Sequence, residues 1–232
     1  MGEKILYAWA MDAPSLELPK DVGFEIGGDT GIDYLVLQVH YNNVDKFKDG
    51  VTKDYSGIEF RMTFQPQQHL AGVYFMVTNE GVMKPKVETK LEAACEYDDY
   101  PVMYPFAYRV HTHKLGRVVS GYRVRDSKWE EIGKRDPQQP QMFYPVSDPD
   151  LTIKNGDTLA MRCTFEGDSE RTVKIGATTK DEMCNFYIMF YTRNQRLPAS
   201  DICLTYDYHW ADNLENIPDK LASTLPEKEG KE

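Results

Sequence analysis

The chain has 232 residues, of which 41% are hydrophobic and 28% charged, and its formal net charge at pH 7 is -10. This length allows one large β-domain or two smaller ones with a real core. The negative charge argues against nucleic acid or an anionic membrane as a partner. No apolar run of about 18 residues could span a bilayer, and the N-terminal MGEKILYAWA lacks the pattern of a signal peptide. We therefore expect no nucleic-acid partner, no membrane segment and no signal peptide in this chain.

Short runs rich in Val, Ile, Tyr, Phe and Thr recur along the chain between clusters of Gly, Pro, Asn and Asp, whereas helical periodicity is scarce. This spacing is typical of an antiparallel β-sandwich or barrel, and we expect an all-β, jelly-roll-like sandwich. In chain order, the sequence predicts strands over residues 34–41, 57–63, 72–78, 103–113, 118–125, 158–165 and 185–191.

Composition shifts divide the chain into four parts. Residues 45–56 are polar and nearly devoid of aliphatic side chains, which is typical of a linker. After residue 210 the chain turns polar and ends in Leu-Pro-Glu-Lys-Glu-Gly-Lys-Glu. We therefore expect the remnant of a first β-domain over 1–50, a linker region over 51–66, a complete C-terminal β-sandwich over 67–215 and a flexible tail over 216–232.

The four cysteines, Cys95, Cys163, Cys184 and Cys203, form no C-x-x-C pair. This spacing suits two disulfides better than a zinc ribbon, and three pairings are possible. Bridged cysteines indicate an oxidising compartment. A chain that begins downstream of its natural N-terminus would reconcile this compartment with the missing signal peptide.

Two strand-like runs carry side chains that could hold a metal. His111 and His113 lie two residues apart, so their rings share one face of a strand. A bare His-x-His is more often two solvated histidines, and Met183 by itself would be core filler. Together, however, two imidazoles and a soft thioether favour copper(I), with a coordination position left open for dioxygen.

The same two faces carry hydrogen-bond donors for an anion. Arg109 extends the face of His111, while the alternating run 183–189 places Asn185 and Tyr187 on the face of Met183. A guanidinium that forms two parallel hydrogen bonds, assisted by an amide and a phenol, is a receptor for a carboxylate. The alternative is that Arg109 forms a surface ion pair and Tyr187 is a core aromatic.

Several longer motifs accompany these residues: ILYAWAMDAP, GFEIGGDTG, YLVLQVHY, FAYRVHTHKLGRVVSGYRVR, QMFYPV and DEMCNFYIMFY. From about Lys4 to about Cys203 the chain resembles the peptidylglycine α-hydroxylating monooxygenase family, which catalyses the first step of peptide amidation. The resemblance implies hydroxylation of the α-carbon of a C-terminal glycine in glycine-extended peptides, with copper as cofactor, ascorbate as reductant and O2 as co-substrate. It also implies the secretory pathway, in the granule lumen or outside the cell, and a downstream lyase that acts on the product.

The resemblance assigns roles to individual residues. It implies that the oxygen-activating copper is bound by His111, His113 and Met183, and that the peptide carboxylate is held by Arg109, Asn185 and Tyr187. His40 would be one ligand of a second, electron-donating copper, and Gln38 would lie between the two coppers. The implied disulfides are Cys163–Cys184 and Cys95–Cys203.

One departure from the family is large. The second copper of the family also takes two adjacent histidines, and none of the five histidines here has a histidine neighbour. We therefore expect the N-terminal part of the first domain to be missing, only one copper(I) to bind well, and coupled turnover to be slow or absent. The alternatives are a dopamine β-hydroxylase-like monooxygenase and a non-catalytic β-sandwich fragment with a single copper; Arg109 and Tyr187 favour the peptide substrate.

Overall fold

The computed structural model describes residues 4–10, 13–41, 43–168, 170–193 and 196–226. It divides into two compact units. Among the described residues, unit 1 is Glu25–Gln67, and unit 2 combines those between 4 and 24 with those between 68 and 226. The residues before Glu25 thus belong with the larger unit, whereas the sequence suggested a single remnant over 1–50.

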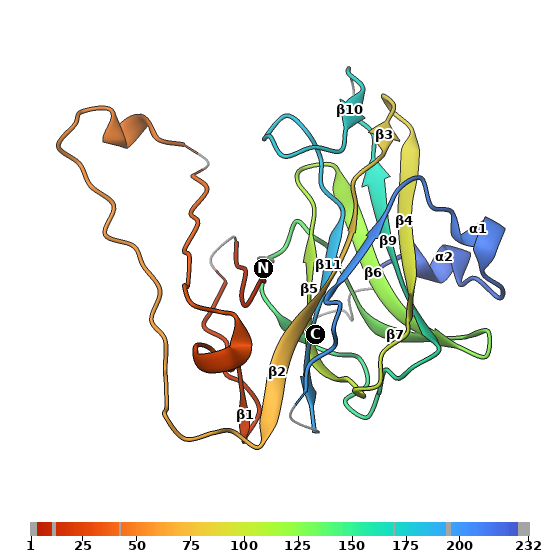
Figure 1. Ribbon diagram of the computed structural model, residues 1–232. Helices are drawn as coiled ribbons and strands as arrows, with labels where there is room; N and C mark the ends of the chain where they lie inside the picture. Colours follow the sequence, from red (N-terminus) through yellow and green to blue (C-terminus); the bar gives the residue numbers. More distant parts are fainter. Residues whose placement is uncertain (1–3, 11–12, 42, 169, 194–195, 227–232) are drawn as a thin grey trace, which may run out of the picture. The chain divides into compact units, whose positions relative to one another are not determined.

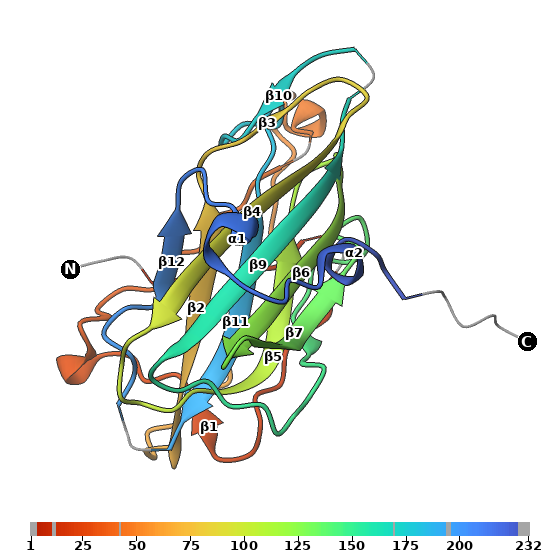
Figure 2. The same cartoon turned by 90° about the vertical axis from the view of Figure 1, so that its right-hand side faces the viewer.

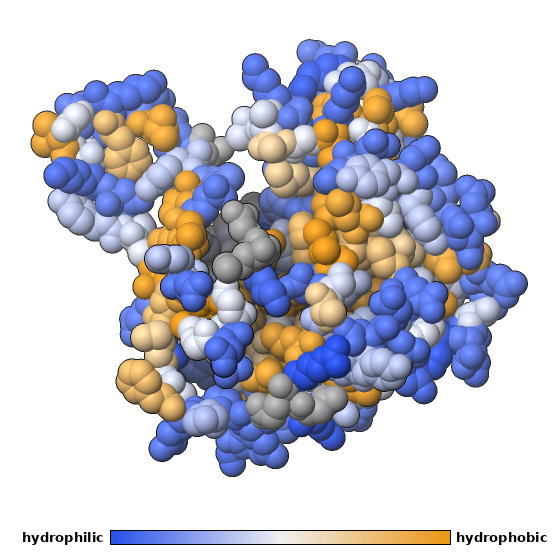
Figure 3. Space-filling view, viewed as in Figure 1, coloured by the Kyte–Doolittle hydropathy of each residue, from blue (hydrophilic) through white to orange (hydrophobic). Residues whose placement is uncertain are grey.

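In the described part of unit 1, drawn in orange shades in Figure 1, the regular elements are two short 3-10 turns, η1 (Gly28–Thr30) and η2 (Asp45–Phe47). The predicted strands over 34–41 and 57–63 are wrong, since neither range is part of a strand in the structure. The side chains of Tyr34 and Val36 are 86% and 87% exposed, and Figure 3 shows hydrophobic residues at the surface of this unit. An alternating sequence forms a stable strand only beside partners that share its hydrogen bonds and cover its apolar face, and the described residues of unit 1 contain no such strand.

Unit 2 is a sandwich of two sheets (Figures 1 and 2). Sheet 1 has the order β1 (Val22–Gly23), β2 (His69–Thr78), β11 (Asn185–Thr192), β5 (Tyr104–His111) and β8 (Tyr144–Pro145), with β12 (Ile202–Thr205) also paired to β2. Sheet 2 has the order β4 (Glu88–Tyr97), β9 (Asp157–Glu166), β6 (Gly116–Arg125) and β7 (Lys128–Arg135). The short strands β3 (Val82–Met83) and β10 (Val173–Lys174) pair with each other. The predicted all-β sandwich is confirmed.

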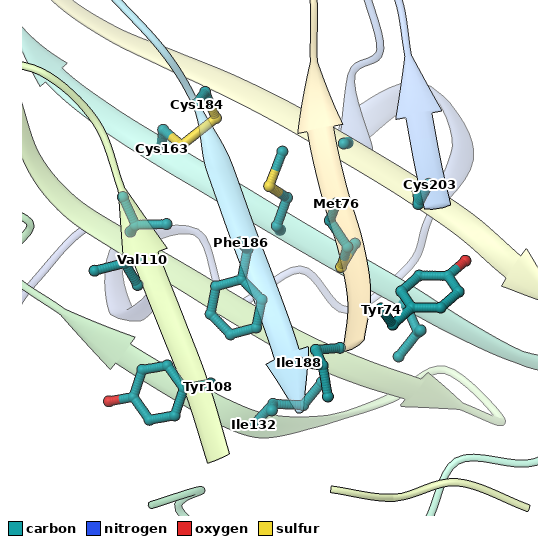
Figure 4. Packing of buried hydrophobic residues seen from close by; sticks show 14 of the residues in the cluster. Tyr74, Met76, Tyr108, Val110, Ile132, Cys163, Cys184, Phe186, Ile188 and Cys203 are labelled. Carbon is teal, nitrogen blue, oxygen red and sulfur yellow. A yellow bond between two sulfur atoms is a disulfide. The ribbon is translucent and has the colours of Figure 1, made fainter. Parts of the chain in front are cut away.

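The core lies between the two sheets. Alternate residues of sheet 1, such as Tyr108 on β5 and Phe186 and Ile188 on β11, point inward and pack against side chains of sheet 2 such as Ile132 (Figure 4). Two disulfides join the sheets, Cys163–Cys184 between β9 and the residue before β11, and Cys95–Cys203 between β4 and β12. These are the two pairings that the resemblance implies.

The C-terminal segment folds onto the outer face of sheet 2. It contains two short helices, α1 (Trp210–Asn213) and α2 (Asp219–Ala222), and the side chains of Trp210 and Ala222 are fully buried there. Arg162 of β9 donates from Nε to Glu92 over 2.7 Å and forms an ion pair with Asp219 over 2.8 Å. The flexible tail expected over 216–232 is therefore wrong for α2, because buried anchors and an ion pair hold that helix in place. No helix in the described part of the chain is long and apolar enough to cross a membrane.

Truncating Phe186 to alanine should destabilise unit 2 strongly. Its side chain is 0% exposed and its ring stacks on that of Tyr108 with centroids 5.7 Å apart. We expect Phe186→Ala to lower the free energy of unfolding by about 3–5 kcal/mol, the usual cost of a large core cavity. Urea unfolding with both disulfides intact measures this, with Phe60→Ala as control because Phe60 is 52% exposed. An equal effect of both substitutions would contradict the inward orientation of Phe186.

Candidate metal centre and anion receptor

The pairing of β5 with β11 brings the predicted metal and anion residues together. The antiparallel register sets Asn185 opposite His111 and Tyr187 opposite Arg109. Cross-strand partners project from the same face of a sheet. These four side chains therefore lie on the outer face of sheet 1, since the residues between them, such as Phe186, point into the core.

His111 is held in one tautomer by Gln141. The ring Nδ1 lies 2.6 Å from Oε1 of Gln141, while Nε2 of the same amide donates to the carbonyls of Thr112 and Pro137 over 3.1 and 2.9 Å. Because those two carbonyls fix the amide orientation, Oε1 accepts and Nδ1 of His111 carries the proton. Burial lowers the pKa of His111 to about 4, so the ring is neutral at pH 7. Its Nε2 lone pair is free for a metal.

His113 is held in the same way by the residues just before Met183. Its Nδ1 lies 2.8 Å from the carbonyl oxygen of Asp181, which can only accept, so Nδ1 donates and Nε2 keeps its lone pair. Its backbone N–H donates to the carboxylate of Glu182 over 2.8 Å, and the N–H of Leu115 donates to the other oxygen over 2.7 Å. Glu182 is 1% exposed, and burial raises the pKa of its carboxyl. The rings of His111 and His113 have centroids 5.4 Å apart.

Met183 is half-buried and lies two residues before β11, whose start at Asn185 agrees with the strand predicted over 185–191. Continuing the register two residues past the Asn185–His111 pair would set Met183 opposite His113. The neighbouring Cys184 is anchored to β9 by its disulfide. Among the described residues no three His, Cys, Asp or Glu side chains form a metal-binding group. A metal here would therefore depend on the thioether, and two neutral imidazoles with a thioether fit copper(I).

Arg109 is a buried cation without a buried anion. The residue is 3% exposed, its Nε donates to the backbone carbonyl of Gln141 over 2.9 Å, and its Nη2 donates to Oε1 of Gln141 over 3.3 Å. Its guanidinium carbon lies 5.0 Å from the centroid of the Tyr187 ring, whose hydroxyl accepts from Nδ2 of Asn185 over 3.3 Å. No carboxylate of the described chain forms an ion pair with it, so it is not the surface ion pair of the alternative interpretation. Burial lowers the pKa of Arg109, and an anion would offset this cost of burying an unpaired charge.

The described residues before Glu25 cover part of the outer face of sheet 1, which explains why the side chains of the anion receptor are buried. Leu16, Leu18 and Phe24 pack against a cluster that includes Tyr187. The backbone N–H of Gln141 donates to the carbonyl of Ala10 over 3.2 Å. This segment therefore shields the receptor from one side.

Sequence reasoning missed Gln141 and Glu182. Gln141 is 4% exposed and contacts both His111 and Arg109, so it links the candidate metal ligand to the candidate anion receptor. It opens the motif QMFYPV, but it lies in a connection where no periodicity marks it. Glu182 precedes Met183 directly, and only its position in DEMCNFY pointed to it.

His40 and Gln38 belong to unit 1, whereas the cluster around His111 belongs to unit 2. Both are exposed residues of unit 1 and lie outside any strand, so the predicted strand that would have carried them is absent.

Comparisons with known proteins identify the family of the chain. Residues 69–212 match the model of the C-terminal domain of copper type II ascorbate-dependent monooxygenases, and residues 2–48 match that of the N-terminal domain. The chain is 44% identical over 226 residues to the peptidyl-glycine alpha-amidating monooxygenase of Mus musculus, covering 97% of the chain and 22% of the relative. It is 51% identical over 189 residues to the Rattus norvegicus enzyme, covering 81% and 19%.

A more distant relative is the dopamine beta-hydroxylase of Canis lupus familiaris, 28% identical over 242 residues, which cover 97% of the chain and 38% of that protein. The chain spans about a fifth of the length of the amidating relatives that it matches. With a family model matched over more than half of its residues, the chain belongs to the copper type II ascorbate-dependent monooxygenase family.

Proposed function

We propose that this chain carries the oxygen-activating site of a monooxygenase that hydroxylates the α-carbon of a C-terminal glycine in glycine-extended peptides. The observation that carries the proposal is the buried guanidinium of Arg109, which has no acidic partner among the described residues and lies two residues from His111 on the same face of β5. Because this guanidinium is always charged and has no carboxylate partner there, it is suited to bind the carboxylate of a ligand.

In this proposal Arg109 binds the two carboxylate oxygens through parallel N–H donors, while Asn185 and Tyr187 supply orienting hydrogen bonds. In a C-terminal glycine the α-carbon is bonded directly to the carboxylate carbon. Holding the carboxylate at Arg109 therefore brings the glycine α-carbon toward His111. Along the strand, His111 is two residues, or about 7 Å, from Arg109. Positioning of this kind is the main contribution that a protein makes beside a redox cofactor.

His111, His113 and Met183 are the residues that would hold copper(I). When bound, the metal would supply the reduction of O2, which no side chain of the chain can perform alone, with ascorbate as the source of electrons. The chain's own groups prepare the site: Gln141 and the carbonyl of Asp181 keep the protons on Nδ1, so that both Nε2 atoms stay available.

The remaining assignments start from the resemblance. We propose His40 as one ligand of the electron-donating copper, with Gln38 beside it on the path of the electron. We propose the lumen of the secretory pathway as the compartment, which the two disulfides support. The hydroxylated peptide would then pass to a separate lyase.

Ligand binding separates the peptide from the arylamine alternative. We expect a blocked tripeptide ending in a free glycine carboxylate to bind at least about tenfold more tightly than its C-terminal amide, because the amide leaves the Arg109 charge unpaired. Equilibrium binding to the copper(I)-loaded chain measures both. Equal affinities, or hydroxylation of a phenylethylamine but not of the peptide in the presence of ascorbate, would favour the dopamine β-hydroxylase-like alternative.

A further inference from the structure

A second candidate site is a cavity of about 380 Å³ at the edge of the sandwich, lined by β2, the end of β4 and residues 196–202. Its walls include Tyr74, Tyr97 and Tyr100 together with Glu96 and Asp98. It shares no residue with the cluster around Arg109 and His111, and its size is within the usual range for ligand sites.

The charges around this cavity are unbalanced. Of the three lining carboxylates, only that of Asp99 is engaged: it accepts from the backbone N–H groups of Tyr100 and Ala199 over 2.7 and 2.6 Å, and it pairs with Arg196 over 3.4 Å. Glu96 and Asp98 are exposed and form no hydrogen bond or ion pair with any described residue. The lining therefore holds three carboxylates against one guanidinium, that of Arg196, which pairs with Asp99.

A buried tyrosine, Tyr74, lies beside them. Tyr74 is 3% exposed, and its hydroxyl forms no hydrogen bond with the described part of the chain. Figure 4 shows this hydroxyl pointing away from Phe186 and Ile188, and the residue lines the cavity. Burial and the nearby charge of Asp98 raise the pKa of Tyr74 to about 12, so the group is a neutral phenol. The hydroxyl oxygen is not fully enclosed by protein, and the residue lines the cavity, so a ligand there can replace water as its hydrogen-bond partner.

We propose that this cavity binds a basic side chain, an ammonium or a guanidinium, of a polypeptide ligand. A guanidinium offers several N–H donors that can reach the carboxylates of Glu96 and Asp98 and the oxygen of Tyr74 at once. The ring of Tyr100, 84% exposed at the rim, adds an aromatic face on which a cation can stack. A divalent metal ion fits less well, because it requires about six or more oxygen ligands in a compact shell.

The surroundings of the cavity favour a peptide over a small amine. Ile202 lines the cavity, and Ile202 and Leu204 on β12 are 46% and 37% exposed. These side chains offer apolar contacts for the residues beside the basic one. The proposal does not rest on the proposed monooxygenase function, because the ligand needs neither Arg109 nor a metal.

The test compares a blocked, amidated peptide, Ac-Leu-Arg-Leu-NH2, with the same peptide carrying citrulline in place of arginine. Neither peptide has a free carboxylate, so neither can use the anion receptor. Binding to the full, disulfide-intact chain is followed by amide chemical shifts and by calorimetry at low salt. We expect the arginine peptide to bind at least about tenfold more tightly, with the largest shifts at residues 95–101 and 196–202.

Two double variants distinguish a site from general attraction to a chain of net charge -10. Glu96→Gln with Asp98→Asn removes two charges at the cavity, and Glu88→Gln with Asp150→Asn removes two at exposed positions that do not line it. We expect the first variant to lose the preference for arginine and the second to keep it. Tyr74→Phe should weaken binding of the arginine peptide without unfolding the chain. Equal affinity for both peptides, or equal losses in both double variants, would overturn the proposal.

Discussion

The reduced chain is expected to bind one copper(I) ion tightly, and Met183→Ile is expected to weaken that binding by more than about 100-fold. Loss of an outer partner of a metal ligand already costs about 10–100-fold in affinity, so loss of a ligand should cost more. The thioether is the donor that makes the set soft enough for copper(I), and isoleucine fills a similar volume without it. Anaerobic titration against a chromogenic copper(I) chelator measures both the stoichiometry and the affinity.

Controls separate coordination from folding. Met62→Ile replaces a methionine of unit 1 that is 73% exposed, and it should leave copper(I) binding unchanged. Gln141→Leu keeps all three ligands but removes the acceptor of the His111 Nδ1 proton, so we expect a loss of about 10–100-fold. Two tight sites per chain, or unaltered retention of copper(I) by Met183→Ile, would contradict the assignment.

The second large effect is expected at Arg109. Arg109→Gln should weaken binding of a peptide with a free C-terminal carboxylate by roughly 30-fold or more, since truncating one partner of a buried charged pair costs about 2–5 kcal/mol. Arg109→Lys keeps the charge but loses the two parallel donors, so it should restore only part of the affinity. Equilibrium binding of the glycine-terminated tripeptide and of its amide gives the comparison, and the amide should be insensitive to both substitutions.

The free energy of unfolding provides a control for Arg109→Gln. Arg162 is buried to the same extent as Arg109, 2% against 3% exposed, but it is paired with Glu92. Arg162→Gln leaves that carboxylate buried and unpaired, and it should lower the free energy of unfolding by about 3–5 kcal/mol. Arg109→Gln removes a charge that has no such partner, so the ligand-free chain should be no less stable. A loss at Arg109 as large as that at Arg162 would mean that Arg109 has a structural role.

Much of the sandwich could be predicted from local pattern. Strands β2, β5, β6, β9 and β11 overlap runs of β-branched and aromatic residues that alternate or are continuously apolar. Strands β4 and β7 escaped notice because ETKLEAACEY and KWEEIGKR are rich in residues that also favour helices. Pairing with β9 and β6 decides their conformation, since strand preference depends on neighbours more than on the residues themselves. The reverse error at residues 34–41 has the same cause, as an alternating run without partners in its unit does not form a strand.

For the candidate site, too, local sequence predicted some features and tertiary structure decided the others. Residue types and a period of two placed Arg109 with His111, and Asn185 with Tyr187, because alternation on a strand is a local property of the backbone. Tertiary structure alone decided that these two rows face each other, since the register of β5 with β11 depends on hydrogen bonds between residues about 75 positions apart. It alone also brought in Gln141 from a connection, directed both Nδ1 atoms to fixed acceptors, and buried Arg109 without an anion. The burial of a group and the charges around it depend on all the residues that surround it in the fold. Most of these residues are distant in the sequence, so no local stretch predicts them.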